Sequence, residues 1–128
     1  MGDHASTYGG DYFHMDVERE SDGYPVVVTV AGDVDLHSGP ELRDRLAAVI
    51  DDDVRHVTID LTHATFLDSM ALGVLLGAKK RLAATGGDLG LVVSNPDLLR
   101  IFEITMLDRV FEIRPTRSQA ATTDGLEG

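Results

Sequence analysis

The chain of 128 residues carries 11 Lys and Arg against 22 Asp and Glu, a formal net charge of −11, and has no cysteine. This length predicts one domain with a single core, and the lack of cysteine excludes disulfides and thiolate metal sites and favours a reducing cytoplasm. The charge opposes nucleic-acid phosphates and anionic lipids, and no apolar run approaches the roughly 20 residues that cross a bilayer. We therefore expect a cytoplasmic protein that binds neither nucleic acid nor membrane. Its acidity either steers it towards a basic partner or only keeps it soluble.

The first third of the chain predicts two strands after a flexible leader. Residues 1–11 are Gly-rich and polar without periodicity, which is typical of a mobile terminus. A half-buried strand follows, indicated by apolar residues at alternate positions: Phe13, Met15 and Val17. Residues 26–31 are apolar and β-branched apart from Thr29, so we expect a strand covered on both faces. The sequence GDVD at 32–35 is expected to break that strand.

A helix and a third strand are predicted next. Ser38 is a suitable helix cap, with Glu41 at the third position of a capping box. The apolar stripe of this helix is Leu42, Leu46, Val49 and Ile50. The acidic triplet at 51–53 follows, and a strand over 57–61 is expected to end near Thr62 and His63.

The second half of the chain alternates helices and strands. A helix over 71–84 is the clearest, with an apolar face formed by Leu72, Leu75, Leu76, Leu82 and Ala83. A strand over 89–93 precedes the pair Asn95-Pro96, which is typical of a helix cap and first turn. Residues 110–113 predict a last strand, and residues 115–128 a tail with at most one short helix.

The order of these elements predicts the fold class. Strands that alternate with helices of about 10–15 residues favour right-handed crossovers and parallel strand pairs. We expect a single α/β domain over residues 12–114, with a mostly parallel, mixed sheet of four to five strands and three to four helices.

Motifs of catalysis are missing from the sequence. There is no Gly-x-Ser-x-Gly turn, and the glycine-rich stretch 86–90 precedes a strand rather than joining a strand to a helix, so it is not a phosphate-binding loop. The five histidines share no metal-ligand spacing. The triplet at 51–53 follows a helix, unlike a phosphoacceptor aspartate, and is interpreted as a solvated loop. We predict no catalytic residue, metal site or cofactor.

The strongest local signal lies where the third strand leads into the helix at Ala71. Ser69 is expected at or beside the helix cap, and on these grounds alone it is either only a cap or a modified residue. Met70, Gly73 and Gly77 fall on one helical stripe outside the core face. Glycine disfavours a helix, so this stripe indicates either the close approach of another backbone or tight packing inside the domain.

Residues 67–76, LDSMALGVLL, resemble the Asp-Ser motif of STAS domains, and among these are most similar to bacterial anti-sigma factor antagonists. That motif usually has Ser or Thr, then Gly, where this chain has Met70 and Ala71. Three further stretches agree in chain order: GDVD at 32–35 with PEL at 40–42, DL at 60–61, and TMLDRVF at 105–111, where Met106 replaces a glycine. The likeness spans residues 13–113.

The resemblance implies a partner-switching protein rather than an enzyme. The unphosphorylated chain would bind an anti-sigma factor of the histidine-kinase-like ATPase type, and that partner or a related serine kinase would phosphorylate Ser69 with its own ATP. A metal-dependent serine phosphatase would reverse the step. The partner-binding residues implied are Asp35, Asp68, Ser69, Met70 and Gly73. The alternatives are a STAS module that senses a small ligand or serves in a larger stress-signalling assembly, and a phosphocarrier enzyme.

Overall fold

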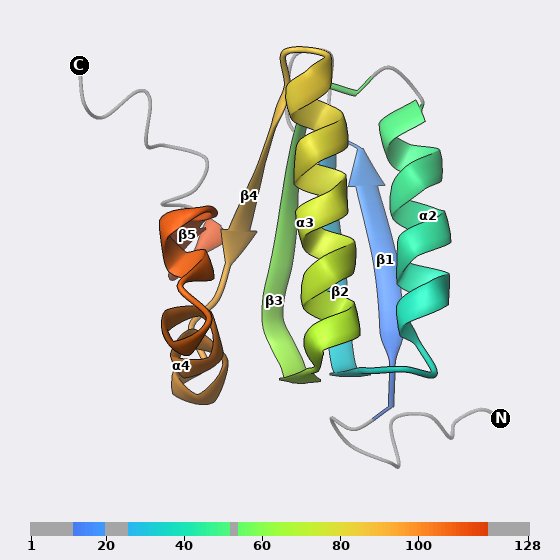
Figure 1. The fold of residues 1–128 in the computed structure, drawn as a ribbon. Coiled ribbons are helices and arrows are strands. Elements are labelled where there is room, and N and C mark those ends of the chain that lie inside the picture. The colour runs from blue at the N-terminus through green and yellow to red at the C-terminus, as the bar shows by residue number, and fades with distance from the viewer. Residues whose placement is uncertain (1–11, 20–25, 52–53, 118–128) are drawn as a thin grey trace, which may run out of the picture.

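The computed structural model describes residues 12–19, 26–51 and 54–117. The predicted leader at 1–11 and the end of the predicted tail, 118–128, lie outside these ranges. Figure 1 shows the elements, which in chain order are β1 (His14–Arg19), β2 (Val26–Val34), α2 (Gly39–Asp51), β3 (His56–Leu67), α3 (Ser69–Ala84), β4 (Asp88–Val92), α4 (Pro96–Ile104), the 3-10 helix η2 (Leu107–Arg109) and β5 (Glu112–Arg114).

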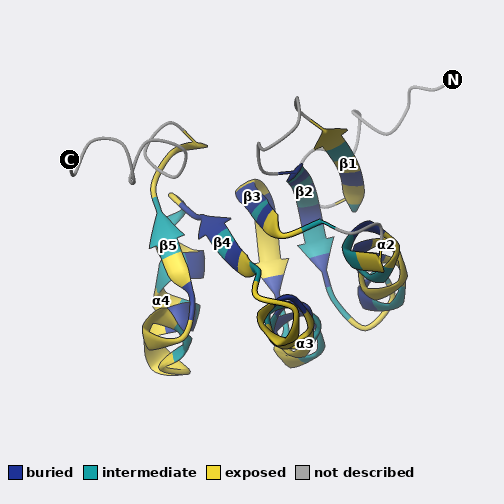
Figure 2. Ribbon diagram, turned by 90° about the horizontal axis from the view of Figure 1, so that it is seen from above, coloured by how far each residue is buried: buried dark blue, intermediate teal, exposed yellow. Residues whose placement is uncertain are grey.

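The five strands form one sheet in the order β1-β2-β3-β4-β5. The β1–β2 pair is antiparallel and the other three pairs are parallel. Because strand order follows chain order and crossovers share one hand, successive connecting helices fall on the same side of the sheet. Figure 2 shows α2 and α3 on one side, with their buried faces towards the strands. The predicted α/β domain with a mostly parallel, mixed sheet is confirmed.

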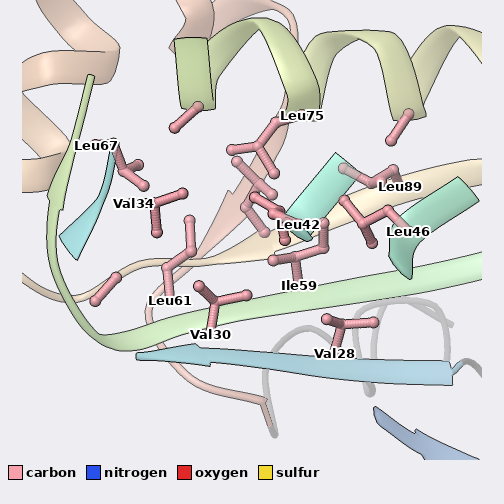
Figure 3. Close-up of a cluster of buried hydrophobic side chains, with 14 of the residues drawn as sticks. Val28, Val30, Val34, Leu42, Leu46, Ile59, Leu61, Leu67, Leu75 and Leu89 are labelled. Carbon is pink, nitrogen blue, oxygen red and sulfur yellow. The ribbon is translucent and has the colours of Figure 1, made fainter. Parts of the chain in front are cut away.

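The core lies between the sheet and helices α2, α3 and α4, the last of which buries Leu98 and Phe102, and Figure 3 shows part of this cluster. The strands contribute β-branched and leucine side chains, and the helices contribute leucines at helical spacing, all of them almost fully buried. Members include Val28, Val30, Ile59, Leu61, Leu42, Leu46, Leu75 and Leu89. Burial of each such side chain contributes about 1.5–3 kcal/mol to folding, so this layer holds α2 and α3 against the sheet.

The predicted strand break at 32–35 is wrong, because β2 continues through Gly32 to Val34. Gly32 has φ +84°, which glycine adopts without strain. A Cβ at this position would lie 2.1 Å from the Tyr12 carbonyl oxygen. The glycine therefore lets the chain before β1 cross close to β2, and it does not end the strand.

The predicted end of the third strand near Thr62 is also wrong, because β3 extends to Leu67. At two places β3 supplies one extra residue against β2, so the alternation of buried and exposed side chains is interrupted twice. As a result the residues of β3 that face the helices are unevenly spaced: Ile59, Leu61, Ala64 and Leu67. A regular period of two could not be recognised in the sequence beyond Leu61.

Smaller differences concern helix α3 and the C-terminal segment. Leu76 is only half-buried and Ala83 is exposed, whereas Ala71 and Ala78 face the core. The predicted Asn95-Pro96 cap is confirmed, since the Asn95 side chain accepts from the Asp97 N–H at 2.8 Å. Met106, where the STAS motif that the sequence resembles has glycine, adopts φ 63°, a left-handed conformation that costs a side-chain-bearing residue about 1–2 kcal/mol.

Asp60 is buried on the face of the sheet opposite α2 and α3, with 6% of its surface exposed. One carboxylate oxygen accepts from the Thr62 N–H at 2.9 Å and the Thr62 hydroxyl at 2.5 Å. The other accepts from Arg117 Nε at 2.5 Å. Arg117 also donates to Glu18 at 3.0 Å and to the Thr29 hydroxyl at 2.7 Å. Burial raises the pKa of Asp60, but the hydrogen bonds from Thr62 and Arg117 outweigh it and leave that pKa lowered.

Arg117 lies beyond the domain end predicted at residue 114, yet it joins β1, β2 and β3 through these contacts. The predicted boundary stays a prediction, and any truncation that tests it should keep Arg117.

We predict that Arg117→Ala lowers the free energy of unfolding by about 1–3 kcal/mol, because a buried carboxylate loses its charged partner. The half-exposed position of Arg117 keeps this below the value for a fully buried pair. Urea unfolding measures the change. The control is Arg43→Ala, whose exposed pair with Asp44 at 3.3 Å should matter by less than about 0.5 kcal/mol. Equal losses in both variants would contradict the assignment.

We further predict that the contribution of Asp60 depends on pH. A carboxyl group whose pKa is lowered by folding stabilises the folded chain above its unfolded pKa of about 3.9, and this is lost as the pH falls through the folded pKa. The stability advantage of the wild type over Asp60→Asn should therefore be largest near neutral pH and shrink below about pH 4. A constant advantage in urea titrations from pH 7 to pH 3 would argue against this role.

Candidate functional site

Strands β2 and β3 end side by side at one edge of the sheet (Figure 1). Val34 pairs with Leu67, and the Asp68 N–H donates to the Val34 carbonyl oxygen at 3.2 Å. Asp35 and Asp68 follow these paired residues directly, so two carboxylates leave the sheet at the same edge. Helices α2 and α3 begin there as well.

Asp68 caps helix α3. Its backbone is extended, with φ −98° and ψ −175°, and its carboxylate accepts from the Ala71 N–H at 2.9 Å. Ser69 is therefore the first helical residue, beside the cap, and the alternative in which Ser69 serves only as a cap is wrong. Ser69 is exposed, and its hydroxyl makes no hydrogen bond to any residue that the structure describes. Among the described residues, this hydroxyl is therefore both accessible and unengaged.

Asp35 organises the turn that leads into α2. One of its carboxylate oxygens accepts from the His37 N–H at 2.9 Å and from the Ser38 N–H at 3.3 Å. The His37 hydrogen bond is the main reason why the pKa of Asp35 is lowered. The carboxylate is thus fixed as an anion in the turn that adjoins Asp68.

The predicted capping box between Ser38 and Glu41 is not formed. The Ser38 hydroxyl instead donates to the Asp33 carbonyl oxygen at 3.0 Å and accepts from the Asp35 N–H at 3.0 Å. Glu41 pairs with Arg45 at 3.6 Å, one helical turn further on. Ser38 therefore stabilises the β2–α2 turn rather than the free N–H groups of α2.

Met70 joins the starts of the two helices. It is half-buried, and its sulfur lies 3.2 Å from the place where a Cβ on Gly39 would be. A side chain at position 39 would displace Met70, so Gly39 allows this contact. Met70 thus lies partly beneath the surface that Ser69 presents, at a position where the Asp-Ser motif that the sequence resembles usually has a second hydroxyl.

Gly73 and Gly77 continue along α3 away from Ser69, and both are exposed. No atom lies within 4 Å of a Cβ built at either position. Tight packing inside the domain, one of the two explanations for these glycines, is therefore excluded. The other explanation, the close approach of another backbone, fits an open helix surface.

Two exposed apolar side chains beside the site were not recognised from the sequence. Leu36, directly after Asp35, is 68% exposed, and Phe66, two residues before Asp68, is 46% exposed. Leu36 stands alone in a polar turn, and the interrupted alternation of β3 hides the outward direction of Phe66. Large apolar groups exposed together at a protein surface are typical of a surface that contacts another protein.

The electrostatic character of this edge is negative. Residues 33–39 and 65–72 contain Asp33, Asp35 and Asp68 but neither Lys nor Arg. The described part of the chain brings together no group of three metal-ligating His, Asp or Glu side chains. Among residues 12–19, 26–51 and 54–117, no helix is long and apolar enough to span a membrane. The arrangement presents one free hydroxyl among fixed carboxylates and apolar side chains, which suits recognition by another protein.

The sequence and the fold were compared with those of known proteins. Residues 15–120 match the profile of the STAS domain. The chain is 33% identical over 96 residues, covering 75% of this chain and 84% of its relative, to the anti-sigma-B factor antagonist of Listeria monocytogenes. The crystal structure of an anti-sigma factor antagonist from Mycobacterium paratuberculosis superposes with a TM-score of 0.79 at 32% identity, covering 87% of this chain and 92% of that one. The Bacillus protein SpoIIAA in its phosphorylated form shares the fold, with a TM-score of 0.63 at 22% identity over 84% of this chain and 95% of that one.

We predict unequal effects on the free energy of unfolding for substitutions of the two neighbours at the start of α3. Asp68→Ala should lower the free energy of unfolding by about 0.5–2 kcal/mol, because the Ala71 N–H loses its acceptor. Ser69→Ala should change it by less than about 0.5 kcal/mol, because the Ser69 hydroxyl has no acceptor or donor to lose and alanine favours a helix. Thermal or urea unfolding of both variants measures this. A larger loss in Ser69→Ala would show that the hydroxyl supports the fold.

Proposed function

The chain belongs to the STAS domain family, and from this premise we propose that it acts as an anti-sigma factor antagonist. In this proposal it binds an anti-sigma factor while Ser69 is unphosphorylated and releases it after phosphorylation. The observation that carries the proposal is the free Ser69 hydroxyl, exposed as the first residue of α3 beside the cap made by Asp68. The names of the similar Listeria and Mycobacterium proteins supply the class of partner.

The chain acts as a substrate in this cycle. The Ser69 oxygen would attack the γ-phosphorus of ATP held by the kinase partner, the hydroxyl proton would leave, and ADP would be released. A metal-dependent phosphatase would return the hydroxyl by transferring the phosphoryl group to water. Both ATP and metal would be bound by the partners, and this chain would supply no catalytic residue.

The position of Ser69 separates the effect of a phosphate on the fold from its effect on a complex. A phosphate adds about −1.5 to −2 charge near neutral pH. At the first residue of a 16-residue helix it meets the positive end of the helix dipole, so the fold should accept it. The neighbouring Asp68 carboxylate opposes part of that benefit, and residues 33–39 and 65–72 contain no Lys or Arg that could pair with the phosphate.

The same charge is unfavourable in an interface. Partner contact with Leu36 and Phe66 would remove water around Ser69, and burial of an uncompensated dianion there is costly. A coupling of about 1–3 kcal/mol, which is common for switches, weakens binding by about 5- to 150-fold. The half-buried Met70 leaves Ser69 as the hydroxyl of this helix start that a kinase can reach.

We predict that the cognate kinase with ATP places one phosphate on Ser69, located by mass spectrometry. Ser69→Ala should fold, bind the anti-sigma factor like the unphosphorylated wild type and resist release by ATP. Ser69→Asp should fold and bind at least about fivefold more weakly, because a carboxylate imitates phosphate incompletely.

Ser94→Asp is the matched control, since Ser94 is also exposed and lies outside α3. It should bind like the wild type. Phosphate on Thr65, Ser94 or Thr105 instead of Ser69, or equal affinity of Ser69→Asp and Ser94→Asp, would refute the switch.

A further inference from the structure

Residues of helices α2 and α3 line an open groove of about 530 Å³ between the two helices. Its apolar lining includes Leu46, Ile50, Val74 and Ala78. Met70 lines the end next to Ser69, so the groove is continuous with the candidate site. From Met70 to Arg81 it follows α3 for about 16 Å, the length of three helical turns.

Part of the groove wall formed by α3 carries no side chains. Gly73 and Gly77 both line it, one helical turn apart, and a Cβ at either position would meet no atom within 4 Å. Each glycine disfavours the helix by about 1 kcal/mol relative to alanine. In return, the backbone of a second element can approach α3 more closely here than beside any larger residue.

The charged residues that line the groove are all basic, although the chain has twice as many acidic as basic residues. Arg43 is bonded to Asp44 at 3.3 Å and Arg81 to Asp51 at 2.5 Å. Lys80 makes no ion pair or hydrogen bond with another described residue. The groove therefore offers an ammonium group beside an apolar floor, on a protein that is otherwise strongly negative.

We propose that this groove binds an acidic amphipathic helix of the anti-sigma factor. This inference rests on the proposed function, which supplies the partner. The apolar stripe of that helix would contact the floor, its backbone would approach Gly73 and Gly77, and a Glu or Asp would pair with Lys80. An elongated apolar groove between two helices fits a helical occupant of about three turns. A second copy of this chain is a poorer occupant, because each copy carries a net charge of −11.

Binding of the anti-sigma factor to groove variants tests this. Gly77→Leu should fold, since open space surrounds the position and leucine favours a helix, but its side chain would fill the groove and weaken binding about tenfold or more. Lys80→Glu should weaken binding about 3- to 10-fold by opposing the acidic helix. The matched controls are Ala83→Leu, on an exposed part of α3 outside the groove, and Arg100→Glu on α4. Both should bind within about twofold of the wild type.

Carbodiimide cross-linking, which joins an amine directly to a carboxylate, tests the acidic helix itself. Mass spectrometry of the cross-linked complex should find Lys80 joined to a Glu or Asp within a helical, amphipathic segment of the partner. If Gly77→Leu binds like Ala83→Leu, or if Lys80 is joined to a second copy of this chain, the inference is wrong. If Ser69→Asp loses binding while the groove variants bind like the wild type, the groove inference is wrong but the proposed function stands. Absence of binding by the unphosphorylated wild type would overturn the proposed function.

Discussion

The pairing of the ends of β2 and β3 is the constraint on which the candidate site depends. Val34 and Leu67 are neighbours in the sheet, so the turns that follow them, and the two helices that those turns begin, emerge at one edge. Both side chains are buried in the core, which fixes the register of this pair. The positions of Asp35, Asp68 and Ser69 on one surface depend on this pairing, which lies beyond the strand ends predicted from the sequence at about residues 31 and 62.

Division of labour between two adjacent residues makes Ser69 suitable for modification. The Asp68 side chain accepts from the Ala71 N–H at the helix start, and Ser69 keeps an unengaged hydroxyl at the position where the helix dipole favours an anion. A serine that also capped the helix would have to break that hydrogen bond before it reacted. Phosphorylation of Ser69, as proposed, would leave the Asp68 cap in place, so the phosphate would alter binding without unfolding the helix.

Different interactions stabilise the two faces of the sheet. On one face, closely packed leucine, isoleucine and valine side chains fasten α2 and α3, and their burial is insensitive to pH. On the other face, Arg117 joins three strands through Asp60, Glu18 and Thr29. This polar cluster holds Arg117, three residues after the end of β5, against the sheet without a second apolar layer. The candidate site and the groove lie on the helices of the first face.

The sequence by itself determined the order of the elements, the α/β class and the position of Ser69 at a helix start, because hydrophobic periodicity and the Asp-Ser motif are local signals. The ends of β2 and β3 were decided only by the tertiary structure, since strand pairing tolerates a glycine at φ +84° and two extra residues that destroy a regular period. The choice of Asp68 over Ser69 as the cap also required the structure, because both residue types cap helices well. Arg117 and Asp60 lie 57 positions apart, and the emptiness around Gly73 and Gly77 depends on where α2 packs. Such relations join residues distant in the chain, and only the folded arrangement of the backbone brings them together.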